Sequence, residues 1–341
     1  MYRIIAFVSA VFFPLCSSAQ DSRFDQDVQY NIVIESPEDS VIEVSYEVLF
    51  ENADSNSESY VTASQDSFLM VLMQDLSIQP KDTSQLLLYI HGMWGGRRIN
   101  FNKSYKLMHR SYIENEKSDI ARIISLKWPG NKQEYKQNKK RLYSISDQIA
   151  EVLMGFVTDL NFELSNNNLH DIQLDLLAHS LGTELLKEVI VDIDTSRVVN
   201  PYFDQMIVAA PDWDIDVFAI DSALMILPLL SNRTHVYYSP RDMTLSISKN
   251  LNKQSRFGLD GPLGAYVIAD NVFYIDVSNV KDDDNFPDRL TGHNYYRASP
   301  IITEDILMTL IGADRDTMPL RNSIDSLKNT YRIIPKPTTE N

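Results

Sequence analysis

From residue 86 onward, short apolar runs alternate with segments of helical periodicity. Continuous apolar runs are typical of strands that a parallel sheet buries on both faces. The predicted strands are 86–90, 121–128, 172–178, 205–210, 234–239 and 271–277. The predicted helices are 103–117, 136–160, 181–193, 216–230 and 243–251. Because strands and helices follow one another in turn, we expect an α/β fold with right-handed crossovers and a mostly parallel, doubly wound sheet.

The residues before 86 and after 312 do not show this alternation of strands and helices. Residues 28–51 contain two stretches of alternating apolar and polar side chains around a turn signal, which predicts an N-terminal antiparallel hairpin. A polar loop follows the hairpin, and the polar segment after Gly312 is expected to fray. The predicted organisation is a signal peptide (1–19), N-terminal strands with a polar loop (20–80), the α/β core (81–312) and a frayed tail (313–341).

The first residues have the features of a cleaved signal peptide. Arg3 precedes an apolar run over residues 4–15, and Ser17 and Ala19 form the small-x-small pattern of a signal peptidase site. We expect export to the periplasm or the exterior, with cleavage after Ala19. A lipoprotein anchored through Cys16 is the less favoured alternative. The apolar run is shorter than the roughly 20 residues that span a bilayer, and no later run reaches that length, so no membrane span is predicted.

Composition excludes several classes of function. Cys16 is the only cysteine, so an exported chain would have no disulfide, no cysteine metal site and no cysteine nucleophile. The 341 residues include 47 Asp and Glu against 31 Lys and Arg, a net charge of −16. So acidic a chain repels phosphate backbones. With no basic stripe to offset the charge, we expect neither nucleic acid nor an anionic membrane surface as a partner.

One predicted strand leads directly into a serine between small residues. The strand 172–178 continues as His179-Ser180-Leu181-Gly182 and then into a predicted helix. A nucleophile on a tight strand-to-helix turn needs small neighbours, here Ala178 and Gly182, because bulky ones would clash with the adjoining strand and helix. Such a turn raises the hydroxyl above the sheet and aims the first helical N–H groups at the site. Ser180 is therefore the predicted nucleophile.

The strand 86–90 ends in a glycine-containing loop that begins His91-Gly92-Met93-Trp94. A loop of this kind lets backbone N–H groups approach a substrate carbonyl. We predict that the N–H groups of Met93 and Leu181 form an oxyanion hole. His91 and His179 are expected to brace the loops around the site.

Asp242 follows the strand 234–239, two strands after Ser180, where the acid of a catalytic triad is expected. Asp242 is therefore the predicted acid, and the alternative role for it is a helix N-cap, a place that Asp also favours. Its rivals are Asp212, Asp214 and Asp216, one strand earlier. Their D-x-D-x-D spacing lacks the glycine and the distal glutamate of an EF-hand loop, so a calcium site is not predicted.

His293 lies beyond the last predicted strand and completes the order Ser, Asp, His along the chain. We predict that it is the general base. His109, His170 and His235 fall where surface or packing roles are expected. The acidic run at 281–285 is expected to be a solvated loop, and neither a metal site nor a cofactor fingerprint such as GxGxxG or GxxxxGK[ST] is identified.

Together these residues resemble an α/β-hydrolase, and more narrowly the esterase-like family called domain of unknown function 900. The matching stretches, over roughly residues 80–310, are YIHGMW, KWPG, LLAHSLGTELL, VAAPDWDIDVF, YYSPRDMTLSIS, FGLDGP and TGHNYY. The resemblance implies an α/β-hydrolase fold, with Ser180 and His293 at the family's nucleophile and histidine and Asp242 at its acid. The chain departs from the family pattern at Trp94 and in the loop after Pro129.

Three functions are compatible with these motifs. The favoured hypothesis is a serine hydrolase that cleaves carboxylic esters, small or lipid-like, through an acyl-enzyme on Ser180. An amide or peptide hydrolase would use the same triad. A non-catalytic binding protein on a hydrolase fold is the third alternative. The sequence predicts no oligomeric state.

Overall fold

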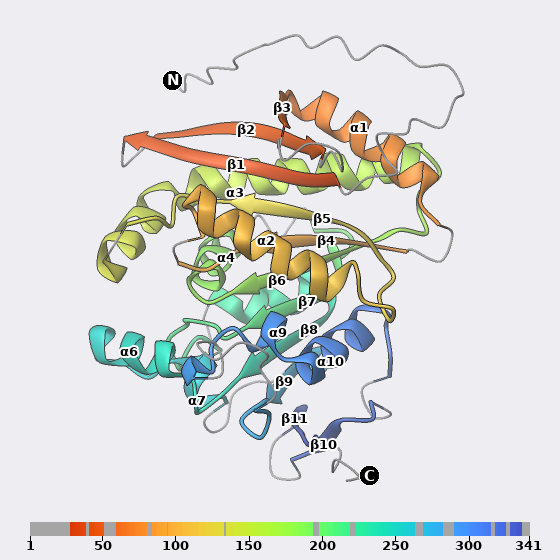
Figure 1. The fold of residues 1–341 in the computed structure, drawn as a ribbon. Helices are drawn as coiled ribbons and strands as arrows, with labels where there is room; N and C mark the ends of the chain where they lie inside the picture. The colour runs from red at the N-terminus through yellow and green to blue at the C-terminus, as the bar shows by residue number, and fades with distance from the viewer. Residues whose placement is uncertain are drawn as a thin grey trace.

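The protein is described by a computed structural model (Figure 1). It describes residues 28–38, 41–50, 59–80, 84–93, 95–132, 134–193, 198–218, 223–262, 269–281, 290–314, 318–324 and 328–335. The predicted signal peptide and Cys16 therefore lie outside the described residues, as do Trp94 and most of the acidic run at 281–285. Within the described ranges, no helix combines the length and the apolar character that crossing a membrane requires.

One mixed sheet organises the fold. In the described residues its strands are β1 (Val28–Glu38), β2 (Val41–Phe50), β3 (Ser59–Ala63), β4 (Gln85–Ile90), β5 (Ile120–Lys127), β6 (Gln173–His179), β7 (Phe203–Ala209), β8 (Ser231–Tyr238), β9 (Val272–Asp276), β10 (Arg321–Ser323) and β11 (Thr330–Ile333). Their order across the sheet is β10-β11-β9-β8-β7-β6-β4-β5-β1-β2-β3. All neighbours from β11 to β1 are parallel, whereas β1, β2 and β3 pair antiparallel with one another. The predicted fold class, with its N-terminal hairpin, is confirmed.

The sheet separates two hydrophobic cores, which explains the continuous apolar runs within its central strands. Every residue of β4 is buried. Leu86, Leu88 and Ile90 contribute to one core, and Leu87 and Tyr89 contribute to the other. Successive side chains of a strand point to opposite faces, so a strand covered on both sides needs an apolar residue at every position.

Helices cover both faces of the sheet. They are α1 (Gln65–Ile78), α2 (Arg98–Tyr112), α3 (Tyr135–Asn166), α4 (Leu181–Val191), α5 (Leu227–Leu230), α6 (Met243–Asn252), α7 (Phe257–Asp260), α9 (Tyr295–Ala298), α10 (Pro300–Leu310) and the 3₁₀ helix η3 (Ala223–Ile226). The core residues of α1, α3 and α4 belong to one cluster, and those of α2, α9 and α10 belong to the other. Figure 1 shows α2, α9 and α10 in front of the sheet with α3 behind it.

The helix predicted over 216–230 is wrong. In its place the described residues hold η3 and the four-residue α5, with 219–222 outside the description. Pro228 stands in the first turn of α5, where its missing N–H is tolerated, but the same residue would break a ladder that began at 216. Helix α2 also begins five residues earlier than the predicted 103–117.

The tail predicted to fray over 313–341 is ordered in part. Strand β11 extends the sheet by pairing in parallel with β9, and β10 pairs antiparallel with β11. Arg321 of β10 is buried and forms an ion pair with Asp305 of α10, with 2.7 Å between Nη2 and Oδ2. At the other end, α1 occupies residues that the sequence pattern assigned to strands and a polar loop.

Candidate active site

Ser180 stands on a strained turn between β6 and α4. Its backbone has φ 54° and ψ −128°, a conformation that residues with a side chain rarely adopt. The turn is tight because α4 begins at the next residue and packs on the end of β4. A Cβ on Gly182 would lie 2.3 Å from the carbonyl oxygen of His91, so only glycine fits there. This is the strand–nucleophile–helix geometry that the sequence around Ser180 predicts.

The structure brings three of the sequence-predicted site residues together. His293 Nε2 lies 2.9 Å from the Ser180 hydroxyl, and His293 Nδ1 lies 2.6 Å from Oδ2 of Asp242. All three residues are buried. An ionised carboxylate can only accept a hydrogen bond, so Asp242 keeps the ring proton on Nδ1. Nε2 is then free to accept the serine proton.

The rival carboxylates have other partners. The Ser248 hydroxyl donates to Oδ1 of Asp212 at 2.5 Å. Arg256 pairs with Asp214 at 2.7 Å between Nη1 and Oδ1. Asp216 is exposed. Among the candidate acids in the described residues, Asp242 is the one whose carboxylate contacts His293.

The loop that carries His293 is held by buried groups. The Nε2–H of His179 donates to the carbonyl oxygen of His293 at 3.2 Å, and the His179 ring packs on Tyr296 with centroids 4.4 Å apart. Burial lowers the pKa of His179 well below its usual value, so the ring is neutral. Gly292 adopts a left-handed φ of 60° just before His293. These contacts fix where the imidazole points.

The predicted oxyanion loop touches the turn at Ser180. A Cβ on Gly92 would lie only 2.9 Å from the Cβ of Ser180, so glycine permits this close approach. Met93 follows and is half-buried, while Leu181 is the first residue of α4. The backbone N–H groups of both residues thus belong to segments that flank Ser180.

His91 braces this loop. Its Nδ1 lies 2.6 Å from the carbonyl oxygen of Gly92, and its Nε2 accepts from the backbone N–H of Trp128 at 3.2 Å. The His91 ring also stacks on the Trp128 indole. Burial lowers the pKa of His91 to about 4, so the ring is neutral near neutral pH. A donor at Nδ1 and an acceptor at Nε2 are what the neutral ring supplies.

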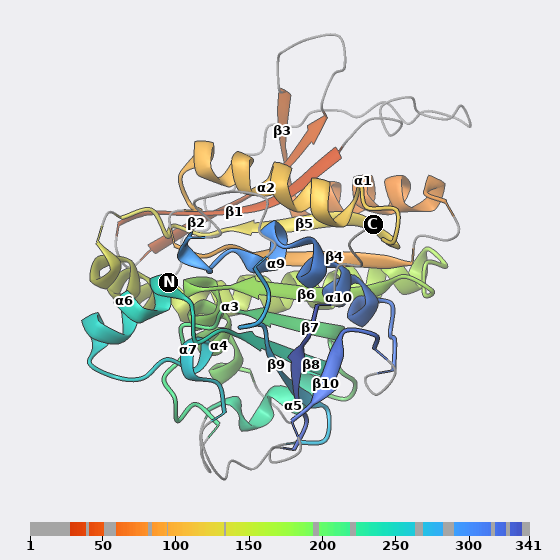
Figure 2. The same ribbon diagram turned by 60° about the horizontal axis from the view of Figure 1, so that its bottom comes forward.

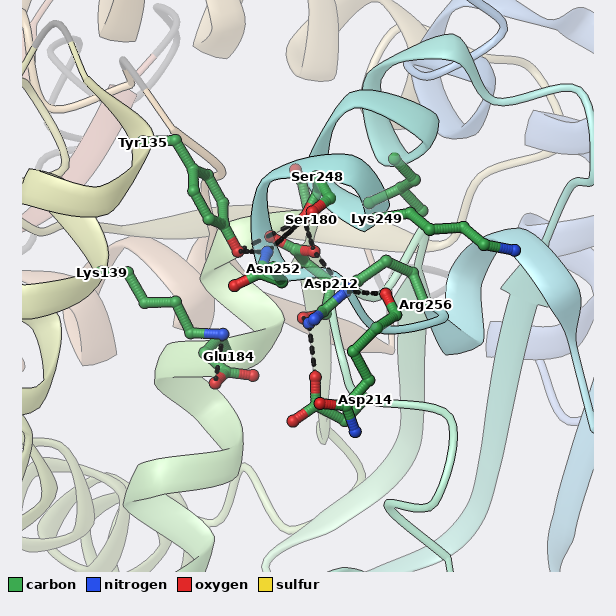
Figure 3. Close-up of polar contacts among 12 residues, drawn as sticks. Tyr135, Lys139, Ser180, Glu184, Asp212, Asp214, Ser248, Lys249, Asn252 and Arg256 are labelled. Atoms are coloured by element: carbon green, nitrogen blue, oxygen red, sulfur yellow. Dashed lines mark hydrogen bonds and ion pairs between the residues drawn. The ribbon is translucent and has the colours of Figure 1, made fainter.

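A buried polar network adjoins Ser180, and the sequence pattern does not predict it (Figure 3). The backbone N–H of Asp212 donates to Thr183 Oγ1 at 3.2 Å, and that hydroxyl donates to the carbonyl of Ser180 at 2.7 Å. Burial raises the pKa of Asp212 despite the hydrogen bond from Ser248. Asn252 of α6 donates to the Tyr135 hydroxyl at 3.0 Å. The network therefore ties α6 to the start of α3.

A second buried group lies one helical turn after Ser180. Glu184 of α4 pairs with Lys187 at 2.9 Å and Lys139 at 3.4 Å, and it accepts a hydrogen bond from Tyr143. Burial raises its pKa, but the two lysines outweigh burial and the net shift is downward. Figure 3 shows Glu184 and Lys139 facing one another. Only the i+4 spacing from Ser180 could have pointed to this residue in the sequence.

Metal-ligand clusters are absent from the described ranges. No group of three His, Cys, Asp or Glu side chains there could hold a metal ion. The described contacts join the Ser180 hydroxyl, the His293 imidazole and the Asp242 carboxylate.

Comparison with known proteins adds a family match. The family model described as alpha/beta hydrolase of unknown function (DUF900) matches residues 64–313. No curated protein matches the chain. Phospholipase PlaB from Legionella pneumophila in complex with thio-NAD is similar at 10% identity and a TM-score of 0.39, over 68% of this chain and 60% of that chain. An uncharacterized protein from Bacillus cereus ATCC 10987 is similar at 13% identity and a TM-score of 0.34, over 71% of this chain and 62% of that one.

Proposed function

Since the chain belongs to the α/β-hydrolase family DUF900, we propose that it is a serine hydrolase that cleaves carboxylic esters through an acyl-enzyme on Ser180. The observation that carries the proposal is the hydrogen-bonded chain from Ser180 through His293 to Asp242, built on a positive-φ turn. In such a chain the carboxylate orients the imidazole, and the imidazole accepts the serine proton while the serine oxygen attacks.

The first half of the reaction acylates the serine. His293 Nε2 accepts the proton of the Ser180 hydroxyl while the serine oxygen attacks the ester carbonyl carbon. The N–H groups of Met93 and Leu181 donate to the carbonyl oxygen as it becomes negatively charged. When the tetrahedral intermediate collapses, the C–O bond to the alcohol breaks and His293 gives its proton to the departing oxygen. An acyl-serine and a free alcohol result.

The second half returns the enzyme to its starting state. His293 accepts a proton from water, whose oxygen attacks the acyl carbon, and the bond to Ser180 then breaks. The proton returns to the serine oxygen and the carboxylic acid leaves. In both halves Asp242 stabilises the imidazolium that forms on His293 and keeps its orientation.

We expect Ser180→Ala to lose labelling by a fluorophosphonate probe, which reacts with activated serines. We also expect kcat/KM on a short-chain chromogenic ester to fall by about 10⁴ or more, because triad members act as a unit. Ser248→Ala is the matched control: it removes a nearby buried hydroxyl and should keep its label. Equal labelling of Ser180→Ala and the wild type would remove Ser180 from the mechanism.

A substrate pair separates ester from amide hydrolysis. An ester and an amide with the same acyl group are compared on the wild-type protein, and we expect turnover of the ester to be the faster. A protein that neither reacts with the probe nor turns over either substrate would instead be a binding protein on a hydrolase fold.

A further inference from the structure

Cations gather in two segments of this acidic chain. Residues 91–106 and 127–141 together contain ten Lys and Arg and a single acid, Glu134, although the whole chain has a net charge of −16. The ten cations are Arg97, Arg98, Lys103, Lys106, Lys127, Lys132, Lys136, Lys139, Lys140 and Arg141. The net charge of −16 therefore combines a basic region with a strongly acidic remainder of the chain.

Both segments lie at the edge of the sheet that carries Ser180. The first follows β4 and begins α2, the second follows β5 and begins α3, and these strands run parallel to β6. The segments touch: Arg97 Nε donates to the carbonyl of Asn131 at 3.4 Å. Asn252 of α6 reaches Tyr135 at the start of α3. In Figures 1 and 2 the starts of α2 and α3 and the whole of α6 lie on the same side of the molecule.

Helix α6 adds an exposed apolar stripe at this edge. Met243, Ile247 and Leu251 are spaced by four residues, so they share one face of the helix. Their side chains are 51%, 60% and 42% exposed, while Leu245 and Ser248 of the same helix are buried. At the start of α2, Ile99 is 80% exposed. We call the starts of α2 and α3, together with α6, the cationic–apolar face.

Of the carboxylates near this face, Glu184 pairs with Lys139 and Asp216 is exposed, whereas three on the β7 and β8 loops have other partners. Asp212 is bonded to Ser248, Asp214 is paired with Arg256, and Asp242 is bonded to His293. Helix α6 and the residues next to its two ends add three further cations, Arg241, Lys249 and Lys253. Of these, Lys249 pairs with Asp260. The face thus combines positive charge with aliphatic side chains that water contacts.

We propose that the cationic–apolar face docks on an anionic lipid surface, from which the site takes its ester substrate; the substrate part rests on the proposed serine hydrolase activity. Cations and exposed aliphatic side chains at one edge of the sheet match the boundary between anionic headgroups and acyl chains. Charges beyond a Debye length of roughly 8 Å are screened at physiological salt, so the acids elsewhere on the chain do not cancel this attraction. Nucleic acid would attract the cations but would leave the aliphatic stripe in water.

The docking test is sedimentation with vesicles. Wild-type protein is mixed with vesicles of pure phosphatidylcholine or of phosphatidylcholine and phosphatidylglycerol at two to one. We expect binding to the second kind only, weakened by added salt. Lys136→Glu with Lys140→Glu should reduce that binding by about tenfold or more. Lys117→Glu with Lys328→Glu, an equal charge change outside the face, is the matched control and should bind like the wild type.

The stripe is tested separately. Ile247→Asp should reduce vesicle binding and hydrolysis of an ester dispersed in the vesicles, and it should leave kcat/KM on a short-chain soluble ester unchanged. Ser180→Ala should bind vesicles as the wild type does, so a failure of the hydrolase proposal does not disturb the binding result. Equal binding to neutral vesicles, equal loss in the control pair, or retention by a double-stranded DNA fragment that competes with the vesicles would overturn the docking proposal.

Discussion

At the scale of single residues, Asp242 uses its two carboxylate oxygens for two purposes. Oδ2 lies 2.6 Å from His293 Nδ1, and Oδ1 accepts the backbone N–H of Leu245 at 2.9 Å as the N-cap of α6. The cap holds the carboxylate in place because the helix fixes the position of its own first turn. The orientation of the imidazole and the start of α6 therefore depend on the same side chain.

Because Asp242 has both roles, its substitution by Asn and its substitution by Ala should differ in their effect on stability. Asp242→Asn keeps an N-cap residue of similar quality but no longer accepts reliably from His293 Nδ1, so kcat/KM should fall by about 10⁴ with little change in stability. Asp242→Ala should lose the same activity and, in addition, about 1 kcal/mol of unfolding free energy. Both are measured by ester kinetics and urea unfolding.

Asp212→Asn is the control for these substitutions, because it changes a buried acid that does not contact His293 in the described structure. We expect it to keep its activity within about tenfold of the wild type. If Asp212→Asn loses activity as severely as Asp242→Asn does, the acid has been assigned to the wrong strand.

Sequence order placed the three groups at strand ends but left the choice of acid open. Asp212, Asp214, Asp216 and Asp242 all follow strands that point to the same edge. The contacts of Asp212 with Ser248, of Asp214 with Arg256 and of Asp242 with His293 show which partner each carboxylate has. Contacts between segments far apart in the sequence leave no periodic signal, so this network was missed.

At the scale of elements, the structure differs from the sequence-based prediction mainly in polar segments. The buried strands β4 to β9 each contain an apolar run, and these runs predict them within a few residues. Strands β10 and β11 contain Arg321 and Arg332, whose partners Asp305 and Asp276 lie on α10 and β9. A polar side chain whose partner is unknown is assumed to face solvent. For this reason the polar pattern of the tail predicts fraying.

The Asp305–Arg321 pair should therefore matter to stability. Both side chains are almost fully buried, and Asp305 also accepts the Tyr237 hydroxyl at 2.8 Å. Arg321→Ala leaves an uncompensated buried carboxylate, and we expect a loss of about 3–5 kcal/mol in unfolding free energy, measured by urea unfolding. The double variant Arg321→Met with Asp305→Leu should recover part of the loss. Lys328→Ala, which breaks an exposed pair with Asp270, should cost less than about 1 kcal/mol. An Arg321→Ala protein as stable as Lys328→Ala would mean that the tail contributes little to the fold.

At the scale of the whole molecule, three histidines are enclosed as neutral rings. Burial lowers the pKa of His91 to about 4, and it lowers the pKa values of His179 and His235 well below their usual value. His235 also faces Arg321, whose Nη1 donates to its Nδ1 at 3.1 Å. The folded protein therefore protonates all three rings at a lower pH than the unfolded chain does. Their burial therefore links folding to pH.

We expect the protein to lose stability as the pH falls from about 6.5 to about 4. In that window the unfolded chain binds protons that the folded chain does not, so the free energy of unfolding rises with pH and falls on acidification. For His91 alone, the difference between 6.5 and about 4 corresponds to about 3 kcal/mol once the pH is below both values. Urea midpoints measured across this range should decrease. His235→Gln, whose side-chain carbonyl can still accept from Arg321, should make the decrease shallower, whereas His170→Asn, at an exposed position, should leave it unchanged. A midpoint independent of pH, or the same slope in His235→Gln as in the wild type, would show that these histidines do not set the acid sensitivity of the fold.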